Sequence, residues 1–143
     1  MQELERRAQP RSFDVIDAGT SLGDLLPLLA RYDRVILVDA IRAGRLPGSI
    51  CEVEIHGPED LERTSGPLSL HELGLAEVLE QARFLNLLPR QIILVGVEPA
   101  HVAWGIGLSE PVQKAMECLI YRIQQLVETG ELPSGNAPAP AAR

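Results

Sequence analysis

Asp39 and His71 are the two residues of this chain whose side chains could carry out chemistry together. Asp39 directly follows Val35–Val38, an unbroken run of apolar β-formers. A short run that is apolar at every position is typical of a parallel strand covered on both faces. In open α/β sheets, ligands bind in the crevice beyond the carboxyl ends of such strands. Asp39 is therefore a candidate ligand-binding residue, and the alternative is that its side chain only stabilises a turn.

His71 stands at the second position of a predicted helix. Ser69-Leu70-His71-Glu72 has the pattern of a capping box, with Ser69 as the N-cap. The positive end of a helix disfavours imidazolium, and a neutral imidazole has a lone pair for a metal or a proton. The alternative is a neutral histidine packed on its neighbours. A carboxylate and an imidazole suit a divalent transition metal such as nickel or zinc, although catalytic sites usually have three protein ligands.

A small-residue turn supplies a further candidate site. Asp17-Ala18-Gly19-Thr20 follows Phe13–Asp17, which is predicted to be a strand. Glycine allows a backbone to approach a ligand closely, so Asp17, Gly19 and Thr20 are candidate substrate-binding residues. The alternative is an ordinary turn between a strand and a helix. No serine lies in a nucleophile elbow, and no glycine-rich loop matches a phosphate cradle.

The elements that must position these residues alternate between strands and helices. All-apolar, parallel-type strands are predicted over Arg34–Asp39, the centre of the sheet, and over Ile92–Val97. Ile50–Ile55 alternates between apolar and polar residues, and the short loop before it favours an antiparallel edge strand. The predicted fold class is therefore α/β: a twisted, mostly parallel sheet with one antiparallel edge strand and helices on both faces, making three layers.

Several local features are predicted around these strands. Glu52 and Glu54 are expected to point outward, where charge opposes pairing of the edge with another chain. The polar segment His56–Pro67 is expected to be irregular. Asp24 is the expected N-cap of a short helix, and Ser109 is the expected N-cap of a last helix that ends at a glycine.

Composition excludes several classes of function. A net charge of −7 over 143 residues argues against nucleic acid and anionic membranes as partners. No segment has the roughly twenty apolar residues of a membrane span. Cys51 and Cys118 fall on apolar stripes and are predicted to be buried thiols, which points to the reducing cytoplasm. The length favours one domain over residues 1–132, followed by a disordered tail over 133–143.

Five blocks of sequence share their order and spacing with a known family. They are Asp17-Ala18-Gly19-Thr20, the run VILVDA from Val35 to Ala40, Ser69-Leu70-His71-Glu72-Leu73-Gly74-Leu75, Leu94-Val95-Gly96-Val97 and Gly107-Leu108-Ser109. Together they resemble the nickel–iron hydrogenase maturation endopeptidases. The resemblance runs from about residue 13 to residue 130.

This resemblance implies a function and a partner. Members of the family bind the nickel of an immature hydrogenase large subunit and then remove its short C-terminal extension. The expected partner is therefore a nickel–iron hydrogenase large-subunit precursor, and the nickel is carried by this substrate. By resemblance, Asp39 and His71 match two of the family's metal ligands, and water is expected to attack a metal-polarised carbonyl.

The chain departs from the family at its beginning. The family opens with a strand and a Gly-x-Gly-Asn loop that supplies a third, acidic ligand, and no such segment occurs here. That strand would lie between Phe13–Asp17 and Arg34–Asp39, so exposed strand edges are expected. A truncated gene product, a misplaced start or a divergent member would each explain the difference. Asp17 or Glu98 is the candidate replacement for the missing ligand.

Two other functions stay open on the sequence. One is a non-catalytic domain that recognises the nickel-loaded subunit without cleaving it, or an inactive truncated member of the family. The other is an unrelated α/β domain that binds a small molecule in the same crevice.

Overall fold

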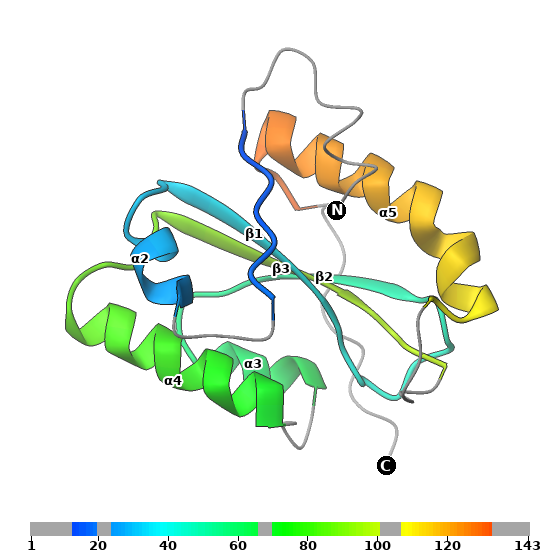
Figure 1. The fold of residues 1–143 in the computed structure, drawn as a ribbon, viewed down its shortest axis with the longest axis horizontal. Coiled ribbons are helices and arrows are strands. Elements are labelled where there is room, and N and C mark those ends of the chain that lie inside the picture. The colour runs from blue at the N-terminus through cyan, green and yellow to red at the C-terminus, as the bar shows by residue number, and fades with distance from the viewer. Residues whose placement is uncertain (1–12, 20–23, 66–69, 101–106, 133–143) are drawn as a thin grey trace.

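The computed structural model describes residues 13–19, 24–65, 70–100 and 107–132, and it contains a three-stranded mixed sheet (Figure 1). The strands lie in the order β1 (Arg34–Ala40), β3 (Gln91–Val97) and β2 (Ile50–Glu54). β1 runs parallel to β3, and β2 runs antiparallel to it. The α/β fold class and the antiparallel edge strand are thus confirmed, in a small sheet with one parallel pair.

The centre of the described sheet is β3 and not β1, which corrects the prediction from the sequence. Every residue of β3 after Gln91 is buried. No residue of β1 is fully buried, and Val38 is 47% exposed. β1 is bonded to only one described strand, so it forms an edge of the described sheet, and the strand edge that was expected to be exposed beside Arg34–Asp39 is found there. The apolar run of β1 gives no local sign of this, because helices still pack on part of both its faces.

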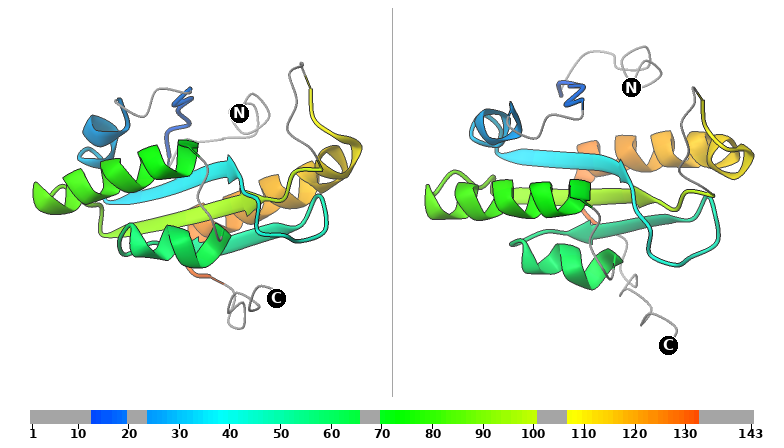
Figure 2. Two further views of the ribbon diagram at one scale, coloured as in Figure 1. Left: turned by 90° about the horizontal axis from the view of Figure 1, so that it is seen from below. Right: turned by 60° about the horizontal axis from the view of Figure 1, so that its bottom comes forward.

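Residues 13–17 form no strand, so that prediction was wrong. In Figures 1 and 2 the segment lies on the outer side of β1, away from β3, and crosses the direction of the strand. A segment that crosses a strand cannot form a ladder of hydrogen bonds with it. The Tyr32 hydroxyl donates a hydrogen bond to Asp14 Oδ2 at 2.7 Å and ties the segment to the residues before β1.

Helices cover both faces of the sheet, so the predicted three layers are confirmed (Figure 2). One face carries α2 (Leu25–Leu29), α3 (Glu59–Ser65) and α4 (Leu70–Phe84), and the other carries α5 (Glu110–Thr129). The alternation of β3 supplies both cores: Ile92 and Leu94 join the α4 side, and Ile93 and Val95 join the α5 side. None of the described helices is both long and apolar enough for a membrane span.

Glu52 of β2 points into the protein, which corrects the prediction that it faces solvent. The predicted alternation itself holds, because Cys51 joins the core under α4 and Glu52 faces α5. Arg122 of α5 donates two hydrogen bonds to the Glu52 carboxylate, from Nε at 2.8 Å and from Nη2 at 2.7 Å. The Glu52 side chain is only 5% exposed. The sequence of β2 alone does not reveal that a helix with a matching charge covers its second face.

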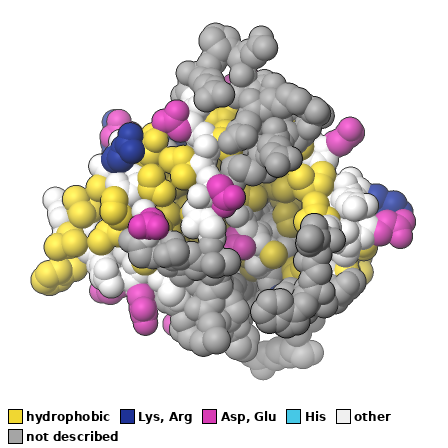
Figure 3. Space-filling model, in the orientation of Figure 1, with side chains coloured by type: hydrophobic (Ala, Val, Ile, Leu, Met, Phe, Trp, Pro, Cys, Tyr) yellow, Lys and Arg dark blue, Asp and Glu magenta, His cyan; other side chains and the backbone are white. Residues whose placement is uncertain are grey.

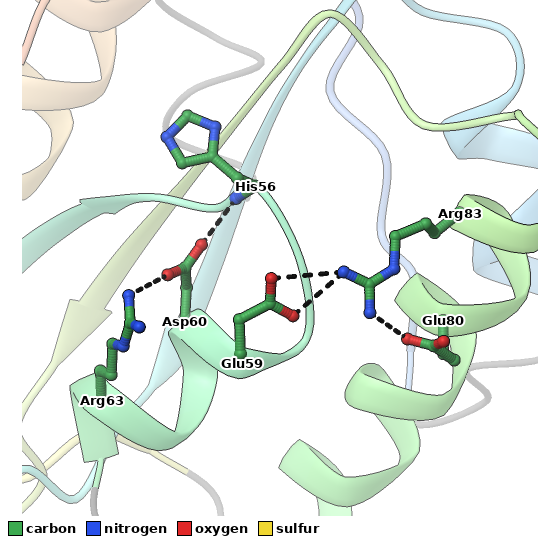
Figure 4. A network of polar contacts seen from close by, with 6 residues as sticks. All are labelled: His56, Glu59, Asp60, Arg63, Glu80 and Arg83. Atoms are coloured by element: carbon green, nitrogen blue, oxygen red, sulfur yellow. Dashed lines mark hydrogen bonds and ion pairs between the residues drawn. The ribbon is translucent and has the colours of Figure 1, made fainter.

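The segment that was predicted to be irregular contains α3. Its first turn is acidic, which suits the positive end of a helix. Asp60 Oδ2 accepts the N–H of His56 at 2.8 Å, and Glu59 pairs with Arg83 of α4 at 3.2 Å (Figure 4). Leu61 is buried and anchors the helix on the core. The helix was missed because Leu61 is its only large apolar residue, so its sequence has no apolar period.

The predicted ends of the other helices are confirmed where the structure describes them. Asp24 is the N-cap residue of α2 and Ser109 that of α5, although neither side chain makes a capping hydrogen bond. Gly130 ends α5 with a left-handed φ of 67°. α4 begins at Leu70, and its predicted N-cap, Ser69, lies outside the described residues, as does the predicted tail.

The two cysteines lie in different environments. Cys51 is buried, and burial raises the pKa of its thiol. Cys118 is exposed on α5, so the prediction that both thiols are buried was wrong.

Candidate active site at the carboxyl edge of the sheet

Asp39 lies at the carboxyl end of β1, on the face of the sheet that α4 covers. Leu37 and Ile41, two positions before and after it, both belong to the core cluster under α2 and α4. Alternate residues of a strand share a face, so the Asp39 side chain leaves the sheet on this side. The residue is partly buried, and its Oδ1 accepts the N–H of Ala40 at 2.8 Å. This is where the sequence placed a candidate ligand-binding acid.

The first residues of α4 lie at the same end of the sheet as Asp39. α4 leads into β3 through a short connection, residues 85–90. The 15 residues of α4 span about 22 Å, and the 7 residues of β3 span about 23 Å. The first turn of α4 therefore lies toward the carboxyl-terminal half of β1 and β3, which are in register, although α4 is tilted relative to the strands and begins short of their ends (Figure 1). His71 is the second residue of α4, and its side chain lies outside the described residues.

Gly96 of β3, directly beside Asp39, leaves space that core side chains occupy. The two residues are partners in the register of β1 and β3, and Cys51 is the partner of Gly96 on its other side. A Cβ at Gly96 would lie 2.4 Å from Ile41 Cδ1 and 2.6 Å from Cys51 Sγ. The absence of a side chain at Gly96 thus lets Ile41 and Cys51 pack against the sheet next to the site.

Glu98 reaches back from the end of β3 to the loop that follows β1. It is 8% exposed, and its Oε2 accepts the N–H groups of Ala43 at 2.8 Å and Arg45 at 3.1 Å. Glu98 was predicted only as a possible replacement for the missing metal ligand. In the structure, one of its carboxylate oxygens accepts hydrogen bonds from two backbone N–H groups. The signal that could have revealed it is an acid directly after an all-apolar strand, the same signal that singled out Asp39.

The loop over residues 41–49 also passes close to the start of α5. Gly48 has a φ of 84°, and a Cβ on it would lie 2.6 Å from the backbone oxygen of Pro111. Gly44 in the same loop has a φ of 71°, but a Cβ there would meet nothing within 4 Å. The two glycines therefore share a backbone conformation that disfavours other residues and differ in the space around them.

Gly48→Ala is expected to destabilise the protein by at least about 2 kcal/mol, because the left-handed conformation costs of order 1 kcal/mol and the clash forces the backbone apart. Gly44→Ala is the matched control and is expected to cost only about 1 kcal/mol, since it carries the conformational cost alone. Urea denaturation of the two variants measures the difference. Equal losses would show that the contact of Gly48 with Pro111 is not tight.

The turn that contains Asp17 is stabilised by its own side chain. Asp17 Oδ1 accepts the N–H of Gly19 at 2.8 Å, and Gly19 has a positive φ of 58°. This is the geometry of an ordinary Asx turn, which agrees with the alternative considered for this motif. Both residues are exposed. Thr20 lies outside the described residues, so the substrate-binding role of the three stays a prediction.

The described residues hold no group of three or more His, Cys, Asp and Glu side chains that could bind a metal ion. Asp39 contributes one carboxylate at the carboxyl edge, and α4 begins at the same edge.

Comparison with known proteins gives a consistent result over most of the chain. Residues 1–126 match the family described as hydrogenase maturation protease. The hydrogenase 2 maturation protease of Escherichia coli K12 is 33% identical over 119 residues, which cover 82% of this chain and 71% of that protein. A hydrogenase expression/formation protein, HupM of Azotobacter chroococcum, is 33% identical over 132 residues, which cover 90% of this chain and 62% of that protein.

The same similarity holds in three dimensions. The solved structure of the hydrogenase maturating endopeptidase HybD from E. coli matches with a TM-score of 0.78 at 32% identity, over 90% of this chain and 80% of that one. The chain spans about three-fifths of the length of two of the curated relatives that it matches, HupM of A. chroococcum (62%) and HupD of Bradyrhizobium diazoefficiens (59%).

Proposed function

The chain belongs to the hydrogenase maturation protease family, and from this premise we propose that it removes the C-terminal extension of a nickel–iron hydrogenase large-subunit precursor. In this proposal the nickel is part of the substrate: the precursor carries it, and the protease recognises the precursor by binding it. The proposal is supported by the position of Asp39 at the carboxyl end of β1, on the face of the sheet that α4 covers, and by the presence of His71 in the first turn of that helix.

In the proposed reaction, water attacks the carbonyl carbon of the peptide bond that joins the extension to the subunit. A carbon–oxygen bond forms, the carbon–nitrogen bond breaks, and the proton released from water passes to the leaving amine. Asp39 and His71 hold the precursor's nickel beside this bond, where the metal polarises the carbonyl oxygen. The partial burial of Asp39 limits access of bulk water and strengthens the attraction between its carboxylate and a cation.

The exposed surface of the site suits a protein substrate. Figure 3 shows groups of hydrophobic side chains, with acidic side chains among them, on the side of the molecule that Figure 1 presents. Ile16, in the segment that crosses β1, is among the exposed large apolar residues, and Val38 is exposed as well, although it leaves β1 on the face opposite to Asp39. Exposed apolar side chains suit contact with another protein, whereas a net charge of −7 disfavours nucleic acid. In this proposal Asp17, Gly19 and Thr20 also contact the substrate, and the reaction takes place in the cytoplasm.

The experiment that tests the proposal compares nickel-loaded with nickel-free precursor. Incubation of the chain with the loaded precursor is expected to give a large subunit shortened by its C-terminal extension, seen as a lower mass. Nickel-free precursor is the control, and it should stay intact because two protein ligands have no metal to engage. Cleavage of both forms alike would contradict the role of nickel, and an intact loaded precursor would contradict the protease function of this chain.

A second candidate function is recognition of the nickel-loaded subunit without cleavage. The same incubation separates the two functions, because nickel-dependent capture of a precursor that keeps its full mass would support the binding domain.

A further inference from the structure

We propose that Glu98 is a positioning residue of the cleavage reaction: its buried carboxylate holds the loop over residues 41–49 in place, and thereby fixes the strand end that carries Asp39. This inference rests on the proposed function, because it assigns a role toward the acid that is proposed to bind the precursor's nickel.

The side chain of Glu98 tethers the first half of the loop. Its Oε2 accepts hydrogen bonds from the N–H groups of Ala43 and Arg45, at 2.8 and 3.1 Å. A buried carboxylate is costly unless it is hydrogen bonded, and bonds to an ionised acceptor are roughly twice as strong as neutral ones. The burial of Glu98 and its two amide donors therefore depend on each other.

The backbone of Glu98 tethers the second half of the loop independently. Its N–H donates to Ser49 O at 2.9 Å, and its carbonyl oxygen accepts the N–H of Gly48 at 2.8 Å. These two bonds continue the contact between the two chain segments beyond the last ladder pair, Ile50 and Val97, with Gly48 and Ser49 both opposite Glu98. One residue thus holds both halves of the loop, but only the first half depends on the side chain.

The first half of the loop is the continuation of the strand that carries Asp39. Ile41 N–H donates to Val97 O at 3.0 Å, and Ala40 N–H donates to the Asp39 carboxylate at 2.8 Å. The orientation of the peptide at Ala40 therefore helps to orient the Asp39 carboxylate through its Oδ1. Ala43 is only three residues further on, so a tether at Ala43 restricts the peptide units that follow Asp39. A catalytic group held loosely by as little as 1 Å loses much of its effect.

The test compares Glu98→Ala with Glu98→Gln. Alanine removes the acceptor, whereas the amide oxygen of glutamine takes the place of Oε2 and accepts the same two bonds. In E98A, amide hydrogen exchange of Ala43 and Arg45, measured by NMR, is expected to accelerate about tenfold or more. Exchange of Gly48 should stay unchanged, because its acceptor is a backbone oxygen. In E98Q all three rates should stay within about threefold of wild type.

The consequence for catalysis is measured on nickel-loaded precursor. E98A is expected to lower kcat about tenfold with less than about a twofold change in KM, and E98Q is expected to restore kcat. Unchanged exchange at Ala43 and Arg45 in E98A would overturn the tether. Equal acceleration at Gly48 would show a general loss of stability and would overturn it as well. Faster exchange with unchanged kcat would overturn the positioning role.

A third variant keeps the proposal testable where E98A does not fold. Glu98→Asp retains the charge but withdraws the carboxylate by about one bond, roughly 1.5 Å. E98D is expected to accelerate amide exchange at Ala43 and Arg45 and to lower kcat, each to a smaller extent than E98A does. Exchange rates and kcat of E98D equal to those of the wild type would overturn the proposal. If wild-type chain cleaves no precursor, the proposed function fails and the positioning role fails with it, while the exchange rates still decide whether Glu98 holds the loop.

Discussion

Asp39→Asn is expected to slow precursor cleavage by at least about a hundredfold while leaving the stability of the fold nearly unchanged. Metal-assisted catalysis contributes several kcal/mol to the barrier, and each 1.36 kcal/mol is a factor of about ten in rate. Asparagine loses the negative charge that attracts the nickel but keeps an oxygen that can accept the N–H of Ala40, as Asp39 Oδ1 does at 2.8 Å. The rate is measured from the mass of the large subunit over time, and the stability from the thermal midpoint.

Two further variants make the effect of Asp39→Asn specific. Asp33→Asn changes an exposed acid next to the opposite end of β1 and should leave the cleavage rate unchanged. His71→Ala should cause a loss similar to that of Asp39→Asn, and the double variant should add little, because groups that act on one ion are not additive. If the fold-reduction in cleavage rate of the double variant equals the product of the two single fold-reductions, Asp39 and His71 act separately.

Arg122→Ala is expected to destabilise the protein by about 3–5 kcal/mol, the largest loss of stability that we expect from one substitution. The substitution removes both guanidinium donors of the Glu52 carboxylate, and the Glu52 side chain is only 5% exposed in the wild-type protein. Removing one partner of a buried ion pair costs far more than the pair contributes, because the remaining charge stays desolvated. The hydrogen bonds to Glu52 also raise the pKa of Arg122, so its guanidinium stays ionised throughout the physiological range. Denaturation in urea measures the loss.

An exposed ion pair on the same helix is the control for Arg122→Ala. Lys114 and Glu110 are both 75% exposed, and Lys114→Ala should change the stability by less than about 0.5 kcal/mol. The double variant Glu52→Leu, Arg122→Met should recover most of the loss, because apolar side chains need no compensating charge. If the double variant is as unstable as Arg122→Ala, the loss of stability comes from packing and not from an unpaired buried charge.

The sequence was sufficient to predict elements that have a strong local signal. β3 is apolar at nearly every position, and α5 has Ser109 and Pro111 at its start and Gly130 at its end. These features act within a few residues, so the pattern of one segment is enough to place them. The candidate acid Asp39 was found in the same way, from the end of an apolar run.

The features that the sequence did not reveal depend on what packs against a segment. The apolar run of β1 resembles that of β3, yet β1 is an edge and β3 the centre, because strand order is decided by long-range pairing. Glu52 is buried only because Arg122, 70 positions away in the chain, lies over it. α3 forms around a single buried leucine, with its acidic first turn and its ion pair to α4 in place of an apolar stripe.

Only part of the candidate site could be predicted from the sequence, because the rest depends on contacts between distant segments. Asp39 and the start of α4 could be placed at one edge, because parallel strands and the helix between them have a fixed geometry. Glu98 has the same local signal as Asp39, an acid directly after an apolar strand, but its tether to the loop could not be predicted, because its two amide donors lie more than 50 positions earlier in the chain. A hydrogen bond between such distant segments leaves no periodic pattern.

The position of β3 between the other two strands has a consequence for synthesis of the chain. β3 is the last of the three strands to leave the ribosome, and β1 and β2 each pair with it and not with one another. No described strand can therefore find its partner until more than 90 residues have been made. During that interval the apolar β1 is a nascent segment without its native neighbour, and such segments are targets for chaperones and prone to aggregate. Assembly of the sheet is thus expected to be late and abrupt, with the final strand joining both edges in one step.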